Sequence, residues 1–461
     1  MHSYGDCVAE RKQEKNNMGK KKIYEDYIGY TLLKPIVDWN VKHSYRKVEV
    51  RGKENIPTDG AVIITPNHCN TLMDALVILR AFDNQTVFGA RADIFNNPAI
   101  GKIMTFIRIL PMVRQRDGLR NVLKNNETQE IIVETLEHKV RFCMFPEGRH
   151  RPAHSLQTLG KGTFRAALAA NARFGDRMPV YIVPTGLEYG DYFRYRSTSL
   201  VTFGKPINVT EFVKGQEVDN EVKLIEPLRK ELASRMSELI TYIKDDENLY
   251  SKWALTKILS VSEGRMYGNF GTGLYEGMLE NRKTAAAIEA LSETAPEAME
   301  KLLEKVEAFE KKRRKKGISV YSFSRKNSVL KATGKAFAAV IGLPYYIFSA
   351  IASAPMWLTY NLLRCKTRDR AFHNTVGFGV KLALGILLFI IYAALSFSLM
   401  PWPYALAVTL LTIPSYSFFF DYNEGMRRFI SDIKVLTDKK IRNFYKDIVK
   451  EFQKIQKFNQ N

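Results

Sequence analysis

Cysteine is scarce in this chain, and its placement argues against a disulfide-built fold. The chain has four cysteines and no Cys-x-x-Cys pair: Cys7, Cys69, Cys143 and Cys365. Scattered cysteines of this kind favour a reducing compartment over a disulfide framework. The seven histidines show no cluster with metal-ligand spacing, so we predict no structural metal.

Acidic residues are also few in comparison with basic ones. The chain has 48 Asp and Glu against 69 Lys and Arg, which gives a net charge of +21. A basic excess suits nucleic acid, an anionic membrane surface or phosphorylated substrates. No zinc-finger spacing or other nucleic-acid motif appears, so we expect no nucleic-acid partner.

Charge is absent altogether from two stretches in the last third of the chain, 336–363 and 382–420. A membrane span needs about 20 apolar residues, so the second stretch can cross twice as a hairpin folded at Pro401 and Pro403. Basic residues flank both stretches, and positive flanks mark the cytoplasmic side. We therefore predict an integral membrane protein whose first stretch re-enters the bilayer and whose second stretch crosses it twice. A fully buried helical core is the alternative.

The N-terminal part lacks the apolar core of a signal peptide, and we expect none there. Residues 23–45 carry aliphatic and aromatic side chains near helical spacing. We interpret 1–45 as a polar N-terminus followed by an amphipathic helix. That helix lies either on a membrane or against the next domain.

Residues 46–215 alternate between short apolar runs and helical patterns. Strands are predicted near 48–50, 61–64, 86–90, 110–113, 140–145 and 180–183. Helices are predicted from Asp74 onward and near 94–109, 127–139 and 161–172. This alternation predicts an α/β fold with a central sheet and flanking helices.

The rest of the chain is predicted to be helical. In the charged region 216–330 we expect a helix at 227–243, with Pro227 in its first turn, and one long helix at 284–316. Membrane segments then occupy 331–425, and a basic helix ends the chain at 426–461.

A histidine and an aspartate frame the start of the domain at 46–215. His68 follows the buried strand 61–64, and Asp74 lies in the first turn of the next helix. A carboxylate that fixes one imidazole tautomer leaves the other ring nitrogen free to act as a general base. The alternative is a structural hydrogen-bonded pair. We interpret Cys69 as a packing residue, because adjacent side chains diverge.

Four blocks along the chain, spread over about 48–209, resemble the glycerolipid acyltransferase family in content and order. They are Asn67-His68 with Asp74, Arg108 to Arg116, Phe145-Pro146-Glu147-Gly148-Arg149-His150, and Val180 to Gly186. The common family pattern has four residues between His and Asp, whereas this chain has five, Cys69 to Met73. The longer spacing resembles the subgroup that acylates glycerol 3-phosphate or dihydroxyacetone phosphate, which is related to the 1-acylglycerol-3-phosphate acyltransferases.

The resemblance implies a reaction without a covalent acyl-enzyme. His68 takes the proton from the acceptor hydroxyl, Asp74 orients His68, and the oxygen attacks the thioester carbonyl. Backbone N–H groups near the His68 loop are candidates for binding the oxyanion. No cofactor is expected, because acyl-CoA or acyl carrier protein serves as the donor substrate.

The acceptor of such an enzyme carries a phosphate, so cationic side chains should converge on the site. The substrate-binding residues that the resemblance implies are Arg114, Arg116, Glu147, Gly148, Arg149 and Lys161. Glu147 either binds acceptor hydroxyls or braces its loop. Gly148 permits a backbone geometry that other residues avoid.

The sequence thus predicts a membrane acyltransferase of phospholipid biosynthesis, with its catalytic domain on the cytoplasmic side. Its partners are an acyl thioester, glycerol 3-phosphate or dihydroxyacetone phosphate, and the lipid membrane. One alternative is an acyltransferase that converts 1-acylglycerol 3-phosphate to phosphatidate. Another is a non-catalytic membrane scaffold that binds lipid.

Overall fold

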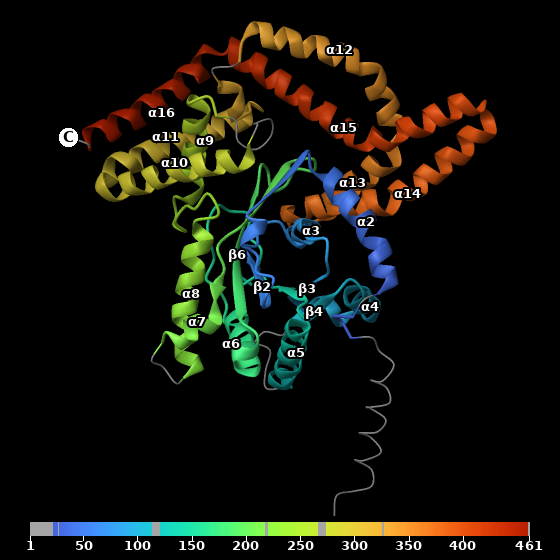
Figure 1. Cartoon of the computed structure of the whole chain (residues 1–461). Helices are drawn as coiled ribbons and strands as arrows, with labels where there is room; N and C mark the ends of the chain where they lie inside the picture. The colour runs from blue at the N-terminus through green and yellow to red at the C-terminus, as the bar shows by residue number, and fades with distance from the viewer. Residues whose placement is uncertain are drawn as a thin grey trace, which may run out of the picture.

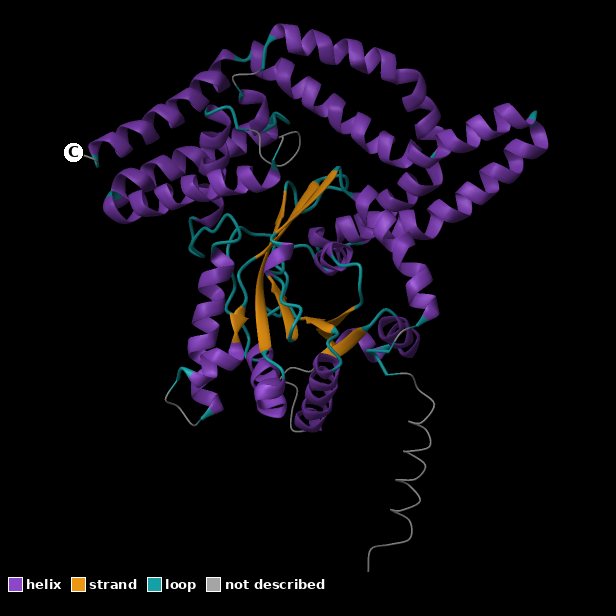
Figure 2. Ribbon diagram, viewed as in Figure 1, coloured by secondary structure: helices purple, strands orange, loops and turns teal. Residues whose placement is uncertain are grey.

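The computed structural model describes residues 22–25, 27–112, 120–216, 220–265, 273–324 and 327–459. An α/β domain occupies the lower centre of the view in Figure 1. A bundle of helices lies above it on one side, and long C-terminal helices lie above it on the other. The predicted α/β fold is confirmed, since Figure 2 shows the strands together at the centre with helices around them.

Within the described residues, eight strands form a mixed sheet. Its order is β1 (Lys47–Arg51), β7 (Thr198–Phe203), β6 (Val180–Tyr189), β2 (Ala61–Pro66), β5 (Arg141–Cys143), β3 (Thr86–Arg91) and β4 (Ile109–Met112), with β8 (Ile207–Asn208) beside β6. Strand β6 pairs antiparallel with β7 and β8, and the other pairs are parallel. Strand β2 lies between β6 and β5 with every residue buried, as its apolar run predicts.

The side chains of β2 alternate between two hydrophobic clusters, one on each face of the sheet. Ala61 and Ile63 belong to one cluster, and Val62 and Ile64 belong to the other. The first cluster is covered by α5 (Arg120–Glu137), α6 (Gly162–Phe174) and α8 (Glu221–Ser237). The second is covered by α3 (Leu72–Ala81) and the end of α2 (Ile28–Ser44). Shorter helices lie at the edges: α4 (Pro98–Phe106) and α7 (Val209–Lys214).

Two helix predictions are wrong in the charged region. Helix α8 begins at Glu221, because the Asn220 side chain accepts a hydrogen bond from the Val222 N–H, and Pro227 therefore lies inside the helix. The predicted long helix is two helices, α10 (Leu274–Thr294) and α11 (Pro296–Lys315), because Pro296 begins a new helix. These pack with α9 (Leu249–Ser262) and α16 (Lys439–Phe458) around a separate apolar cluster.

Three helical segments are long and apolar enough to cross a membrane: Val329–Ala352 (α12), Arg370–Leu399, which contains α14 (His373–Leu399), and Trp402–Thr437 (α15). Many of their large apolar side chains are exposed, which indicates that the protein associates with a membrane. The predicted hairpin turn is confirmed, since α14 ends at Leu399 and α15 begins at Trp402. The predicted division at residue 425 falls inside α15.

The C-terminal helices are packed directly onto the α/β domain. Phe378 of α14 belongs to the same cluster as the buried side chains of α3, and its carbonyl accepts a hydrogen bond from the Asn40 side chain at 3.0 Å. Asp421 of α15 pairs with Arg46 and Arg196 of the domain. Helix α13 (Ala354–Lys366) precedes α14, and the segment between them reaches the carboxyl edge of the sheet.

Candidate active site

Two of the sequence blocks meet at the carboxyl end of the central strands. Strands β2 and β5 are parallel neighbours, with Ile64 opposite Cys143. The Met144 N–H donates to the Ile64 carbonyl at 3.0 Å, which keeps the two chains together past the strand ends. The residues that follow β2 and β5 therefore lie side by side, as expected for sites in α/β sheets.

His68 and Asp74 form a hydrogen-bonded pair despite the five-residue spacing. Nδ1 of His68 lies 2.7 Å from Oδ2 of Asp74, which is fully buried. The same oxygen accepts the backbone N–H groups of Cys69 at 2.8 Å and Asn70 at 2.7 Å. The Tyr189 hydroxyl donates to the other oxygen at 2.7 Å. The Cys69 thiol is a weak fifth donor, to that other oxygen at 3.8 Å. The carboxylate is thus held in one orientation by five donors.

This arrangement selects the tautomer of His68. Because Nδ1–H donates to the Asp74 carboxylate, the lone pair of the imidazole is on Nε2. The His68 side chain is 18% exposed, and its ring stacks on Phe145 with the centroids 4.3 Å apart. Burial raises the pKa of the Tyr189 phenol well above its usual value, so its hydroxyl stays a donor. His68 is therefore oriented as a general base with its second nitrogen available.

Thr71, one of the five residues between His68 and Asp74, has a positive φ. Its φ is 49°, which is unusual for a β-branched residue and strained. The Thr71 hydroxyl lies 2.9 Å from that of Thr375 at the start of α14, and 3.4 Å from the Ala371 carbonyl, to which it donates. Contacts with the C-terminal helices therefore support this strained residue.

The Glu147 side chain contacts the backbone of the His68 loop. One of its carboxylate oxygens accepts the His68 backbone N–H at 3.4 Å, and the other accepts the Gln157 side-chain amide at 2.7 Å. Burial raises the pKa of Glu147 to about 7. The contacts are those of a residue that braces its loop, one of the two roles considered for it. Gly148 has φ 64°, so the expected need for glycine is confirmed.

The expected phosphate ligands are only partly within the described residues. Arg114 and Arg116 lie outside them. Arg149 and Lys161 are exposed, and the Gly160 N–H donates to the Pro146 carbonyl at 2.7 Å, which brings Lys161 beside the Phe145–Gly148 block. Two cations therefore flank this edge of the site, on loops that follow β5.

Sequence reasoning missed a wall of the site that comes from the C-terminal region. His150 lies 5.7 Å from His68, ring centroid to ring centroid, and its Nε2 is 2.6 Å from a carboxylate oxygen of Asp369. Phe372 packs edge-on against His150 at 5.5 Å. His150 was visible as the last residue of the third block. Asp369 and Phe372 gave no local signal, because the contact joins residues more than 200 positions apart.

The Cys69 thiol and three backbone amides of the loop are unsuited to a direct role in catalysis. Burial raises the pKa of the Cys69 thiol well above its usual value, so the thiolate is disfavoured and the packing interpretation of Cys69 fits. The N–H groups of His68, Cys69 and Asn70 donate to the Glu147 and Asp74 carboxylates. An oxyanion stabiliser must therefore come from other donors. No cluster of three potential metal ligands appears in the described part of the chain.

Comparisons with known proteins show what this chain is similar to. Residues 47–188 match the model of the Acyltransferase family. The chain is also similar to the crystal structure of the 1-acyl-sn-glycerophosphate (LPA) acyltransferase PlsC from Thermotoga maritima. That match has 20% identity and a TM-score of 0.32, and covers 44% of this chain and 80% of the other. No curated protein matches. Residues 47–188 are therefore similar to the domain that the Acyltransferase model describes.

Proposed function

We propose that this protein transfers a fatty acyl group from a thioester donor to a hydroxyl of glycerol 3-phosphate or dihydroxyacetone phosphate. The observation that carries the proposal is the 2.7 Å contact between His68 and Asp74, made across five intervening residues. The longer spacing resembles that of the subgroup using these acceptors. The pair is fully formed here, so the extra residue is compatible with a working dyad.

The chemistry needs no acyl-enzyme. Nε2 of His68 takes the proton from the acceptor hydroxyl while the oxygen forms a bond to the thioester carbonyl carbon. The carbon–sulfur bond breaks, and the departing thiolate of coenzyme A or of an acyl carrier protein takes the proton from His68. The Asp74 carboxylate stabilises the imidazolium in between.

Substrate positioning falls to the neighbouring loops. Arg149 and Lys161, exposed at the same edge, are suited to the acceptor phosphate, together with Arg114 and Arg116. Glu147 and Gly148 shape the loop that follows β5. The basic flanks of the apolar helices favour a catalytic domain on the cytoplasmic side of the membrane.

The test is a transfer assay with purified full-length protein in neutral detergent. Radiolabelled acyl-CoA is supplied with glycerol 3-phosphate, dihydroxyacetone phosphate or 1-acylglycerol 3-phosphate, and the acylated product is separated by thin-layer chromatography. We expect product with one of the first two acceptors. His68→Ala should lose at least about a hundredfold in rate, and His138→Ala, at an exposed position directly after α5, should keep the wild-type rate.

The acceptor series also separates the alternatives. Turnover only with 1-acylglycerol 3-phosphate would assign the protein to the second acylation step and refute the proposed acceptor. If no acceptor supports turnover with either acyl-CoA or acyl carrier protein as the donor, the protein is a lipid-binding scaffold, and the proposal fails.

A further inference from the structure

A cavity of about 260 Å³ lies between the apolar C-terminal helices and α2, and neither His68 nor Asp74 is part of its lining. Its walls come from α2, the end of α12, α13, α14 and α15. Most of the lining is apolar, with Leu382, Leu388 and Phe389 on the α14 side. One charged residue, Lys381, is part of the lining.

Lys381 is unusual because it is a buried cation in a membrane-type helix. It is only 6% exposed and directly precedes the charge-free run 382–420. Its ammonium nitrogen lies 4.9 Å from the centre of the Trp39 ring and 3.5 Å from the Ser417 hydroxyl. Within the described residues no carboxylate forms an ion pair with it. An ionisable residue placed in this way marks a functional site by default.

Two further buried polar groups line the same cavity. Asn40 is 2% exposed and Tyr416 is 1% exposed. In the described part of the chain, the side-chain oxygen of Asn40 and the hydroxyl of Tyr416 have no hydrogen-bond partner. Buried polar atoms are normally satisfied. The unpartnered Asn40 oxygen and Tyr416 hydroxyl, in the same cavity as the Lys381 ammonium, therefore point to a polar ligand group.

The other wall of the cavity suits a hydrocarbon chain. Gly385 follows Lys381 by one turn on the same face of α14, and a side chain there would meet only the Lys381 stem, at 3.8 Å. Ile386 and Phe389 line the cavity and are also 49% and 39% exposed, so the cavity borders surface that faces lipid. A ligand with a charged head and an apolar chain can therefore enter from the membrane.

We propose that this cavity binds a single-chain anionic lipid, with its carboxylate or phosphate at Lys381 and its chain along Gly385 toward Phe389. Basic pockets between membrane helices bind anionic lipid heads. The site is separate from the acyl-transfer chemistry at His68 and does not depend on it. The lipid can come from free fatty acid or from 1-acylglycerol 3-phosphate, since both present an anionic head on one chain.

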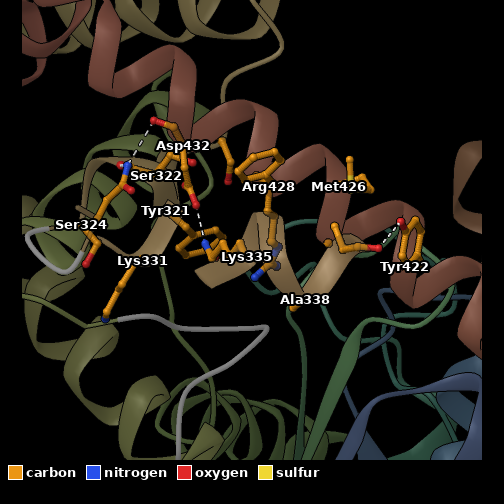
Figure 3. Close-up of a pocket in the computed structure, with 15 residues that line it drawn as sticks. Tyr321, Ser322, Ser324, Lys331, Lys335, Ala338, Tyr422, Met426, Arg428 and Asp432 are labelled. Atoms are coloured by element: carbon orange, nitrogen blue, oxygen red, sulfur yellow. Dashed lines mark hydrogen bonds and ion pairs between the residues drawn. The ribbon is translucent and has the colours of Figure 1, made fainter. Parts of the chain in front are cut away.

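A second cavity, of about 420 Å³, provides the contrast (Figure 3). It lies between α12, α15 and the segment before α12, and it is lined by Lys331, Lys335, Arg428 and Asp432. Figure 3 shows Lys335 paired with Asp432, and Arg428 pairs with Glu424 at 2.8 Å. Acidic side chains thus compensate Lys335 and Arg428, and Lys331, an exposed residue of the same cavity, serves as a control position.

The experiment is photolabelling of the full-length protein in phosphatidylcholine nanodiscs with a diazirine-bearing fatty acid, read by peptide mass spectrometry. Labels are expected on the α14 segment that follows Lys381. Oleate and 1-oleoylglycerol 3-phosphate are expected to compete, and the stronger of the two identifies the source of the ligand. Neutral monooleoylglycerol should compete at least about tenfold more weakly, because it makes no charge-assisted contact.

Variants test the head and the chain separately. Lys381→Met and Gly385→Leu should each lower labelling of α14 by about tenfold or more, and Lys381→Arg should restore much of it. Gly379→Leu, at an exposed position of the same helix, Lys331→Met and His68→Ala should label like wild type. Thermal unfolding of every variant checks the fold. Equal competition by monooleoylglycerol, or full labelling of Lys381→Met, would overturn the proposal.

Discussion

Replacing Asp74 with asparagine removes one unit of charge from the centre of the site while nearly preserving its shape. Three of the five donors to Asp74 reach the same oxygen, Oδ2. The asparagine carbonyl can take this position and still accept the N–H groups of Cys69 and Asn70. Its amide would then face the Tyr189 hydroxyl, which can accept a hydrogen bond as well as donate one. We therefore expect Asp74→Asn to fold.

The loss should appear in turnover. Without the carboxylate, the imidazolium that forms on His68 as it takes the acceptor proton loses its direct ion-pair partner. We expect kcat to fall by about 10²–10⁴, the usual contribution of a positioned acid–base group. That range corresponds to about 3–5 kcal/mol of activation free energy. The assay is steady-state acyl transfer at saturating donor and acceptor, with thermal unfolding of the same preparations.

Tyr189→Phe is the matched control. It keeps the charge of Asp74 and its contact with His68 but removes the 2.7 Å hydrogen bond to the other oxygen. Among the described residues, only the weak thiol donor of Cys69 then remains at this buried oxygen. The free energy of unfolding should fall by about 1–3 kcal/mol, with a much smaller effect on kcat. If Asp74→Asn folds and keeps kcat within about tenfold of wild type, the charge of Asp74 plays no part in the reaction.

Three other predictions concern binding, stability and topology. Arg149→Ala and Lys161→Ala should raise KM for the phosphorylated acceptor with little change in kcat, since phosphate is bound in both ground and transition states; unchanged KM in both variants would remove them as phosphate ligands. Burial raises the pKa of Glu147 from 4.5 to about 7, so the native state binds the proton more tightly than the unfolded state. The free energy of unfolding should then fall by about 3 kcal/mol as pH rises from about 4.5 to 7, and Glu147→Gln should flatten this dependence in denaturant titrations. Single cysteines near Arg368 and near Trp402 should react with a membrane-impermeant thiol reagent from opposite sides of the membrane, and reaction of both from one side would refute the hairpin crossing.

Several features of this protein could be predicted from the sequence because they depend on local pattern. The fully apolar run at 61–64 predicted the central strand, and the alternation around it predicted the sheet. His68 and Glu147 each follow a predicted strand, and the carboxyl ends of neighbouring parallel strands meet at one edge. The prolines at 401 and 403 predicted the turn between the last two long helices, since proline favours the first turn of a helix.

Other features were decided by contacts between distant parts of the chain. Whether His68 reaches Asp74 depended on the backbone at Thr71, which Thr375 of α14 supports. The Asp369 contact with His150 also comes from the C-terminal region. Strain at one residue is tolerated only where packing and hydrogen bonds hold it, and those partners lie hundreds of positions away. Periodicity and spacing report neighbours along the chain, so only the tertiary structure could show that the C-terminal helices help to form the candidate active site.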